Sequence, residues 1–151
     1  LKILLTQLLS MLAGITLLIV LITAIGVGTC EGLFPGELDI PLFLKLNGAL
    51  LLFHLMLGGI AFLPACIFND SKWYFSIGAG LLVLFFLFQM LGNTGGDMEF
   101  FRYLTLFTLF PGKNIVDGEG DVLLKCLGMA GAAIVMYGCG AVCFHKKDLP
   151  L

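Results

Sequence analysis

The stretch Leu4–Val27 reads LLTQLLSMLAGITLLIVLITAIGV and contains no charged side chain. A helix rises about 1.5 Å per residue, so about 20 apolar residues cross a hydrocarbon core of about 30 Å. A helix at a water-facing surface hides one apolar stripe and keeps the other face polar, whereas this stretch is apolar on every face. The stretch therefore predicts a helix that spans a membrane.

Three further stretches have the same character, and they are Leu42–Phe68, Trp73–Leu91 and Val122–Phe144. None of the four stretches contains Asp or Glu, and the only Lys or Arg residues in them are Lys45 and Lys125, each about a turn from an end. We therefore expect an all-α fold: a polytopic membrane helix bundle with four transmembrane helices.

The composition excludes a separate water-soluble domain. The 151 residues are 60% hydrophobic and only 12% charged, with a formal net charge of −2, and an ordinary soluble domain carries about twice that share of charge. We expect one transmembrane domain over residues 1–151. The basic residues form no run longer than His145-Lys146-Lys147, so nucleic acid is not an expected partner.

The sequence enters an apolar helix almost at Leu1. A cleaved signal peptide is one explanation, but Leu4–Val27 is longer than a signal core and no small-residue cleavage site with a polar region follows it. We expect instead a fragment of a longer protein that lacks upstream helices.

The longest polar part, residues 92–121, contains a short aromatic segment. Met98–Phe110 reads MEFFRYLTLFTLF and lies between a glycine-rich stretch and Pro111-Gly112. The segment is too short to span a membrane and carries aromatic residues on several faces. It therefore predicts a short interfacial or re-entrant helix.

An even number of spans places both ends of the chain on one side of the membrane. Lys and Arg are equally divided between the two sides. The cluster His145-Lys146-Lys147 lies directly beside a span, however, and the opposite loops are mainly acidic. We therefore expect a multi-pass protein of the plasma membrane with both termini in the cytoplasm.

The residues at membrane depth offer little chemistry. Polar side chains there are limited to His54, Gln89 and small hydroxyls such as that of Thr16. His54 is either a proton relay or substrate contact or, as we favour, a neutral imidazole bonded to a neighbouring helix. No catalytic motif is present and the five cysteines form no metal-binding pattern. We therefore expect no catalytic residue, no metal, no cofactor and no intrinsic enzyme activity.

Small residues four apart let the backbones of membrane helices approach closely. Three such pairs predict sites of helix packing, and they are Ala24 with Gly28, Ser76 with Gly80, and Gly128 with Ala132.

The order of segments resembles the C-terminal four helices of an ABC-2-type permease, the membrane subunit of a bacterial ABC exporter. Leu57–Ser71, LGGIAFLPACIFNDS, looks like the end of that family's fourth helix and the cytoplasmic turn after it. Phe100–Gly120, which begins FFRYLTLFTLFPGKNIVDG, is similar to the family's extracellular segment. Val142–Leu151, VCFHKKDLPL, looks like the family's closing basic pair followed by Asp-Leu. One departure is the absence of a Ser near Pro64.

The resemblance implies a pathway formed with a second permease copy or a paralogue and driven by a separate cytoplasmic ATP-binding subunit. It also implies that Trp73–Leu91 lines this pathway and that the segment after it forms an outer lid. The cargo-pathway candidates are Phe85, Phe86, Gln89, Met90 and His54. The extracellular lid candidates are Phe101, Tyr103, Leu104 and Phe107.

Two functions remain open from the sequence. The first is export of an amphipathic or hydrophobic cargo, because a strongly anionic cargo would need basic residues along the path. The second is a non-transporting structural or regulatory membrane subunit of a larger complex.

Overall fold

The computed structural model describes residues 2–118 and 120–146. Four long helices account for most of them: α1 (Lys2–Leu33), α2 (Ile40–Ile67), α3 (Ser71–Gly92) and α5 (Val122–His145). All four are long and apolar enough to cross a membrane. The predicted all-α class and the four long apolar helices are confirmed. Lys147 and the Asp-Leu pair after it, which belong to the family resemblance, lie outside the described residues.

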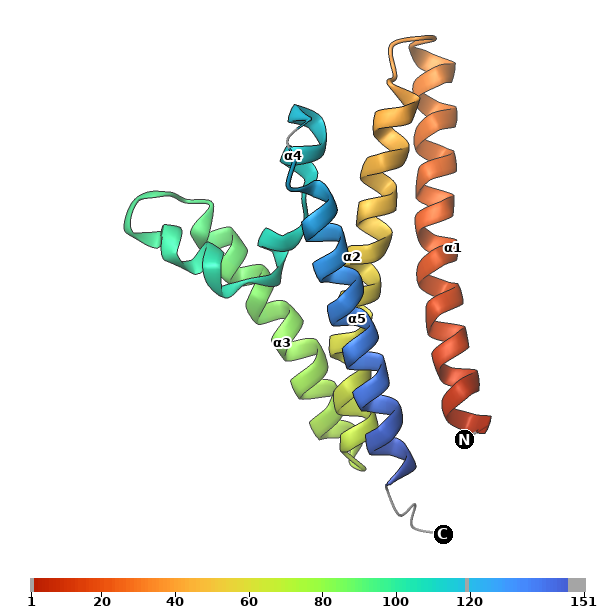
Figure 1. Cartoon of the computed structure of the whole chain (residues 1–151), viewed down its shortest axis with the longest axis vertical. Helices are drawn as coiled ribbons and strands as arrows, with labels where there is room; N and C mark the ends of the chain where they lie inside the picture. Colours follow the sequence, from red (N-terminus) through yellow and green to blue (C-terminus); the bar gives the residue numbers. More distant parts are fainter. Residues whose placement is uncertain (1, 119, 147–151) are drawn as a thin grey trace.

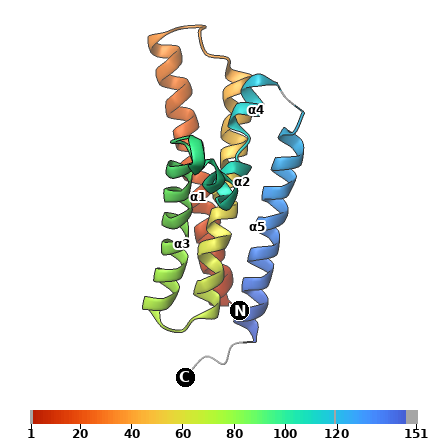
Figure 2. The same ribbon diagram turned by 90° about the vertical axis from the view of Figure 1, so that its left-hand side faces the viewer.

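α2 lies at the centre of the bundle and contacts α1, α3 and α5 (Figures 1 and 2). The first turn of α1 and the last turn of α5 lie at the same end of the molecule, opposite the loop that joins α1 to α2 (Figure 1). Both ends of the described chain therefore lie on one side of the bundle, as four spans require.

Aspartate side chains cap the N-termini of the two middle helices. An Asp39 carboxylate oxygen accepts a hydrogen bond of 3.0 Å from the Leu42 amide, and Pro41 occupies the first turn of α2. Asp70 caps α3 in the same way, with a bond of 3.0 Å from the Lys72 amide. These caps satisfy amides that the helices leave free. A turn of three residues joins α2 to α3, and the two helices form an antiparallel hairpin.

The interface between α2 and α5 carries the buried core. One cluster consists of Phe53, Met56, Met129 and Ala133. Across the same interface the Tyr137 hydroxyl donates a hydrogen bond of 2.8 Å to the backbone oxygen of Leu55. In lipid, the hydrophobic effect does not favour contact between helices over contact with lipid tails. Close packing and interhelical hydrogen bonds therefore hold the helices together.

α1 is mostly exposed, and its threonine hydroxyls bond within the helix. Each of its threonine hydroxyls donates to a backbone oxygen one turn earlier: Thr6 to Lys2, Thr16 to Leu12, Thr23 to Ile19 and Thr29 to Ile25. The threonine hydroxyls are thus satisfied within the helix, as a lipid-facing surface requires, whereas the exposed Ser10 hydroxyl forms no hydrogen bond among the described residues.

The closest helix approaches occur at other glycines than those predicted. A Cβ added at Gly78 would lie 3.4–3.5 Å from backbone atoms of Ala61, so α3 and α2 touch there. By contrast, a Cβ at Gly28, Gly80 or Gly128 would meet nothing within 4 Å. The prediction that these three glycines mark helix contacts is therefore wrong within this chain, because the apolar pattern does not tell which face of each helix turns inward.

α3 diverges from α2 and α5 along its length, and the following segment occupies the space that opens between them (Figure 1). This segment forms two 3-10 helices, η1 (Gly96–Leu104) and η2 (Leu106–Leu109), rather than a single helix. A short helix, α4 (Gly112–Asp117), then leads to α5. The sequence does not predict α4, which is only six residues long.

Candidate functional site

The chain reverses after α3 at two glycines and returns toward the bundle. Gly95 and Gly96 adopt φ values of 83° and 64°, which side-chain-bearing residues rarely adopt. Gly92, at the end of α3, lies directly against Arg102 of η1, and a Cβ at Gly92 would overlap the Arg102 side chain and its backbone nitrogen. These glycines let η1 fold back against the end of α3.

Side-chain hydrogen bonds hold the returning segment in its bent form. The Thr105 hydroxyl is buried and accepts a bond of 3.2 Å from the Phe107 amide at the start of η2. The Thr108 hydroxyl donates to the backbone oxygen of Arg102 in η1. Since 3-10 helices longer than a turn are uncommon, these bonds help to explain the shape of the segment.

The returning segment reaches the middle of α2. Phe53 lies 13 residues after the first residue of α2, which corresponds to about 20 Å of a helix about 42 Å long. Phe107 and Phe110 both pack on Phe53, with ring centroids 5.2 and 5.7 Å away. The short segment after α3 is thus re-entrant with respect to the bundle, the second of the two arrangements predicted for it.

An apolar cavity of about 390 Å³ lies between α2, α3, η2 and α5. Phe85, a predicted pathway residue, lines it, together with Ile60, Leu106 and Met136. Phe86 turns to the lid instead and contacts Phe107, with ring centroids 6.2 Å apart. Of the predicted pathway residues, Phe85 is thus the one that lines this cavity among the described residues. The four lid candidates do not line it, although Phe107 reaches the neighbouring Phe86.

The two polar pathway candidates bond within their own helices. His54 is half-buried beside Phe53, and its Nδ1 lies 2.9 Å from the backbone oxygen of Leu50. Gln89 is half-buried and donates a bond of 3.3 Å to the Asn93 side chain, while its Oε1 is buried with no hydrogen-bond partner among the described residues. The favoured interpretation of His54 as bonded to a neighbouring helix is thus wrong, because the oxygen nearest its ring belongs to α2 itself.

The remaining candidates lie outside the aromatic cluster. Phe101 packs on Phe88, with ring centroids 5.3 Å apart. Met90 and Leu104 are exposed, and Tyr103 is 83% exposed. The structure does not bring these three side chains to the cavity.

Sequence reasoning missed the residue on which the cluster centres. Phe53 is buried and contacts His54, Phe107 and Phe110. No signal in the sequence separates it from the other apolar residues of α2, because that helix is apolar on all sides.

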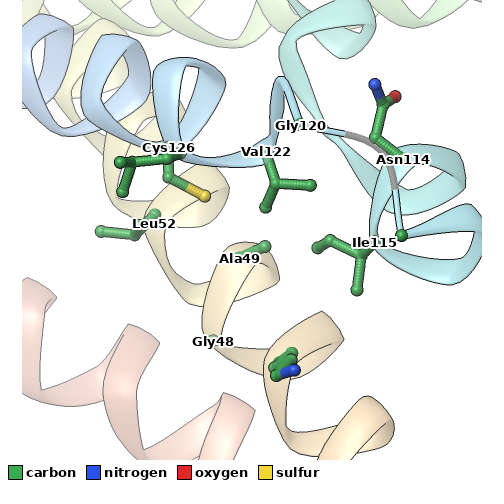
Figure 3. Close-up of a pocket in the computed structure, with 11 residues that line it drawn as sticks. Gly48, Ala49, Leu52, Asn114, Ile115, Gly120, Val122 and Cys126 are labelled. Carbon is green, nitrogen blue, oxygen red and sulfur yellow. The ribbon is translucent and has the colours of Figure 1, made fainter.

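A second cavity, of about 650 Å³, lies between the first half of α2, α4 and the start of α5. Ala49, Leu52, Ile115 and Val122 contribute apolar walls (Figure 3). Lys45 is the one charged residue among the described residues that line this cavity. Neighbouring Lys125 donates a hydrogen bond of 3.1 Å to the side-chain oxygen of Asn114, another lining residue.

Within residues 2–118 and 120–146, no group of three or more His, Cys, Asp or Glu side chains is arranged to hold a metal ion. No protein-family model, curated protein or solved structure matches this chain. The candidate sites are therefore defined by the geometry of the chain alone.

Proposed function

We propose that this chain forms part of the membrane-spanning permease subunit of an ABC exporter of the ABC-2 type. In this proposal a second copy or a paralogue completes the pathway, and a separate cytoplasmic ATPase drives transport. The observation that carries the proposal is the re-entrant segment of residues 96–110, whose Phe107 packs on Phe53 at the middle of α2. A segment that enters the bundle from one side and stops halfway is suited to close a pathway at that side.

The apolar lining of the cavity beside this segment supports an amphipathic or hydrophobic cargo. Phe85, Leu106 and Met136 bring side chains from three different elements to it. None of its lining residues carries a charge, so a charged solute would lose its hydration there without compensation. A cargo with an apolar body would exchange lipid contacts for similar contacts with these residues.

Among the described residues, no Asp, Glu, Lys or Arg lies deep in a span, where an ion-coupled carrier would hold its coupling charge. Apart from Lys45 and Lys125 near the ends of α2 and α5, the described spans carry charge only in their terminal turns. Ion-coupled carriers keep ionisable residues at membrane depth because the coupling charge binds or moves there. Energy supplied by a separate ATP-binding subunit is consistent with this distribution.

The test is ATP hydrolysis by the assembled complex. The full protein that contains this chain is purified together with its ATPase partner, reconstituted into vesicles and given an amphipathic peptide or a hydrophobic drug. We expect hydrolysis to rise several-fold when cargo is added, and vesicles that hold the ATPase without this chain provide the control.

A complex that contains no ATP-binding subunit, or whose hydrolysis ignores every cargo tried, would contradict the proposal. The second result would favour the alternative function, a structural or regulatory subunit, which should instead alter the stability of its partner when it is removed.

A further inference from the structure

The cavity between α2, α4 and α5 is built from three separate elements. Gly48, Ala49 and Leu52 of α2 form one side, Val122 and Cys126 of α5 form another, and Ile115 of α4 closes a third (Figure 3). Its volume of about 650 Å³ lies within the range of about 300–1,000 Å³ that is typical of small-molecule sites. Most of its surface is apolar.

A lysine with no partner among the described residues lines this apolar cavity. Lys45 lies five residues after the first residue of α2, about 8 Å along the helix axis. It forms no ion pair and no hydrogen bond within residues 2–118 and 120–146. Lys45 is exposed, and a cation at this depth of a membrane is costly unless it pairs with an anion or extends to the interface.

A second cation lies beside the same cavity. The Lys125 ammonium of α5 bonds to Asn114 of α4, so it reinforces the positive charge next to Lys45. Acidic residues lie close by in the sequence: Asp117 and Asp121 are exposed and form no ion pair within the described residues, and Glu119, between the lining residues Gly118 and Gly120, lies outside them. Among the described residues that line the cavity, the charge is positive and comes from Lys45.

We propose that this cavity binds an anionic phospholipid, with the phosphate of the headgroup on Lys45 and an acyl chain along the apolar walls. Charge complementarity selects a phosphate-bearing occupant, because a lysine ammonium binds phosphate as a point charge. The apolar walls select a phosphate attached to a hydrocarbon chain over a free anion. Leu123, a lining residue, is 70% exposed, so the cavity continues into surface that would face lipid.

This inference is independent of the proposed transport function. The occupant is a resident lipid from the leaflet at the α4 end of the bundle and is not the transported cargo. Its binding is therefore tested on the purified protein without an ATPase.

The test measures lipid retained by the protein. The chain is reconstituted into nanodiscs that contain equal amounts of phosphatidylglycerol and phosphatidylcholine, released into mild detergent, and weighed by native mass spectrometry. We expect wild-type protein to retain phosphatidylglycerol in preference to phosphatidylcholine. Lys45→Gln should reduce the retained phosphatidylglycerol about tenfold, as loss of a charge-assisted contact implies. Lys45→Arg should preserve it.

Lys72→Gln is the matched charge control, because Lys72 lies in the first turn of α3 at the other end of the bundle. This variant should leave the retained phosphatidylglycerol unchanged. Equal retention by wild type and Lys45→Gln would overturn the proposal, as would displacement of the lipid by millimolar inorganic phosphate, which would indicate a site for the free anion.

Glu119, outside the described residues, is also tested: Glu119→Gln should raise retention or leave it unchanged, and a decrease would contradict an anionic occupant.

A second pair of variants tests the cavity without altering charge. A Cβ at Gly48 would meet nothing within 4 Å, so Gly48→Leu should fill space without displacing backbone and should lower retention several-fold. Gly48 also lines a groove between α1 and α2, which Gly28 shares. Gly28→Leu, which affects that groove alone, is therefore the control and should retain lipid normally. If Gly48→Leu retains as much lipid as Gly28→Leu, the cavity is not the site.

Discussion

Phe107 of the re-entrant segment packs edge-on against Phe53 near the middle of α2, with ring centroids 5.2 Å apart and ring planes at 60°. Such aromatic pairs contribute about 0.5–1.5 kcal/mol beyond the area that they bury. This pair links the segment after α3 to the central helix, across 54 residues of sequence, and it sets how deeply the segment enters the bundle.

We expect Phe53→Ala and Phe107→Ala to be coupled in a double-mutant cycle. The coupling should be about 1 kcal/mol in the free energy of unfolding, because each substitution removes the same ring contact. Unfolding by added SDS in bicelles, followed by circular dichroism, measures it. Phe75, which is 70% exposed on α3, supplies the control: Phe75→Ala should add independently to Phe53→Ala. Additive behaviour of the Phe53 and Phe107 variants would show that the segment does not rest on α2.

The bond from the Tyr137 hydroxyl to the Leu55 backbone oxygen, 2.8 Å long, should also be measurable. Tyr137→Phe removes one interhelical hydrogen bond and leaves the ring in place, so we expect a loss of about 0.6 kcal/mol, the size found for such bonds between membrane helices. Tyr74→Phe, at an exposed position of α3, should change the same unfolding free energy very little. An equal effect of the two substitutions would exclude a role for the bond.

The four helices could be predicted from sequence because their signal is a sum over many residues. A stretch of about 18 or more apolar residues indicates a membrane span, whatever the rest of the sequence contains. The ends of the helices were less predictable. α1 continues to Leu33, six residues past the end of the predicted span at Val27, because neither Cys30 nor Glu31 is a residue that ends a helix.

The packing inside the bundle could not be predicted, for a related reason. In a helix of a water-soluble protein, the polar face shows that the opposite face is buried. α2 is apolar all round, so its sequence does not show that Phe53 is buried. The glycines illustrate the same point. Gly78 meets Ala61 and Gly80 meets nothing, although the two are only two residues apart and equally small.

The depth of the re-entrant segment depends on contacts distant in sequence. Its length showed only that it could not span, whereas the choice between interfacial and re-entrant placement rests on Phe107 and Phe110 reaching Phe53. α4 was missed because six residues are too few for a periodic pattern, and its one buried side chain, Ile115, is fixed by contacts with α2.

The orientation of the bundle can be tested with single cysteines in a cysteine-free background. If both termini are cytoplasmic, a cysteine at Glu37, in the loop between α1 and α2, should react in intact cells with a maleimide that cannot cross membranes. A cysteine at Asn69, in the turn between α2 and α3, should react only after the cells are permeabilised. The reverse pattern would invert the assignment, and labelling of both positions in intact cells would contradict a bilayer-spanning α2.

The proposed cargo pathway predicts a contrast between two faces of α3. Phe85 lines the apolar cavity with Leu106, whereas Val83 is 57% exposed. Phe85 is half-buried, so Phe85→Ala should reduce cargo-stimulated ATP hydrolysis by the reconstituted complex about fivefold, because the loss of its apolar contacts costs about 1 kcal/mol. Val83→Ala should leave the stimulation intact. Stimulation that survives Phe85→Ala would remove this cavity from the pathway.

The contact between α2 and α3 predicts a position-specific response to side-chain size. A Cβ at Gly78 would lie at ordinary contact distance from Ala61, so Gly78→Ala should be tolerated. Gly78→Leu has no room for the atoms beyond Cβ, and we expect it to lower the free energy of unfolding by about 1–3 kcal/mol, the usual cost of overpacking.

Gly80→Leu points into open space and gains helix propensity, so its stability should be unchanged or slightly higher. Because the two substitutions are chemically identical and two residues apart on one helix, any difference between them in an SDS titration reports the interface with α2. If Gly78→Leu proves as stable as Gly80→Leu, the hairpin does not close at Ala61.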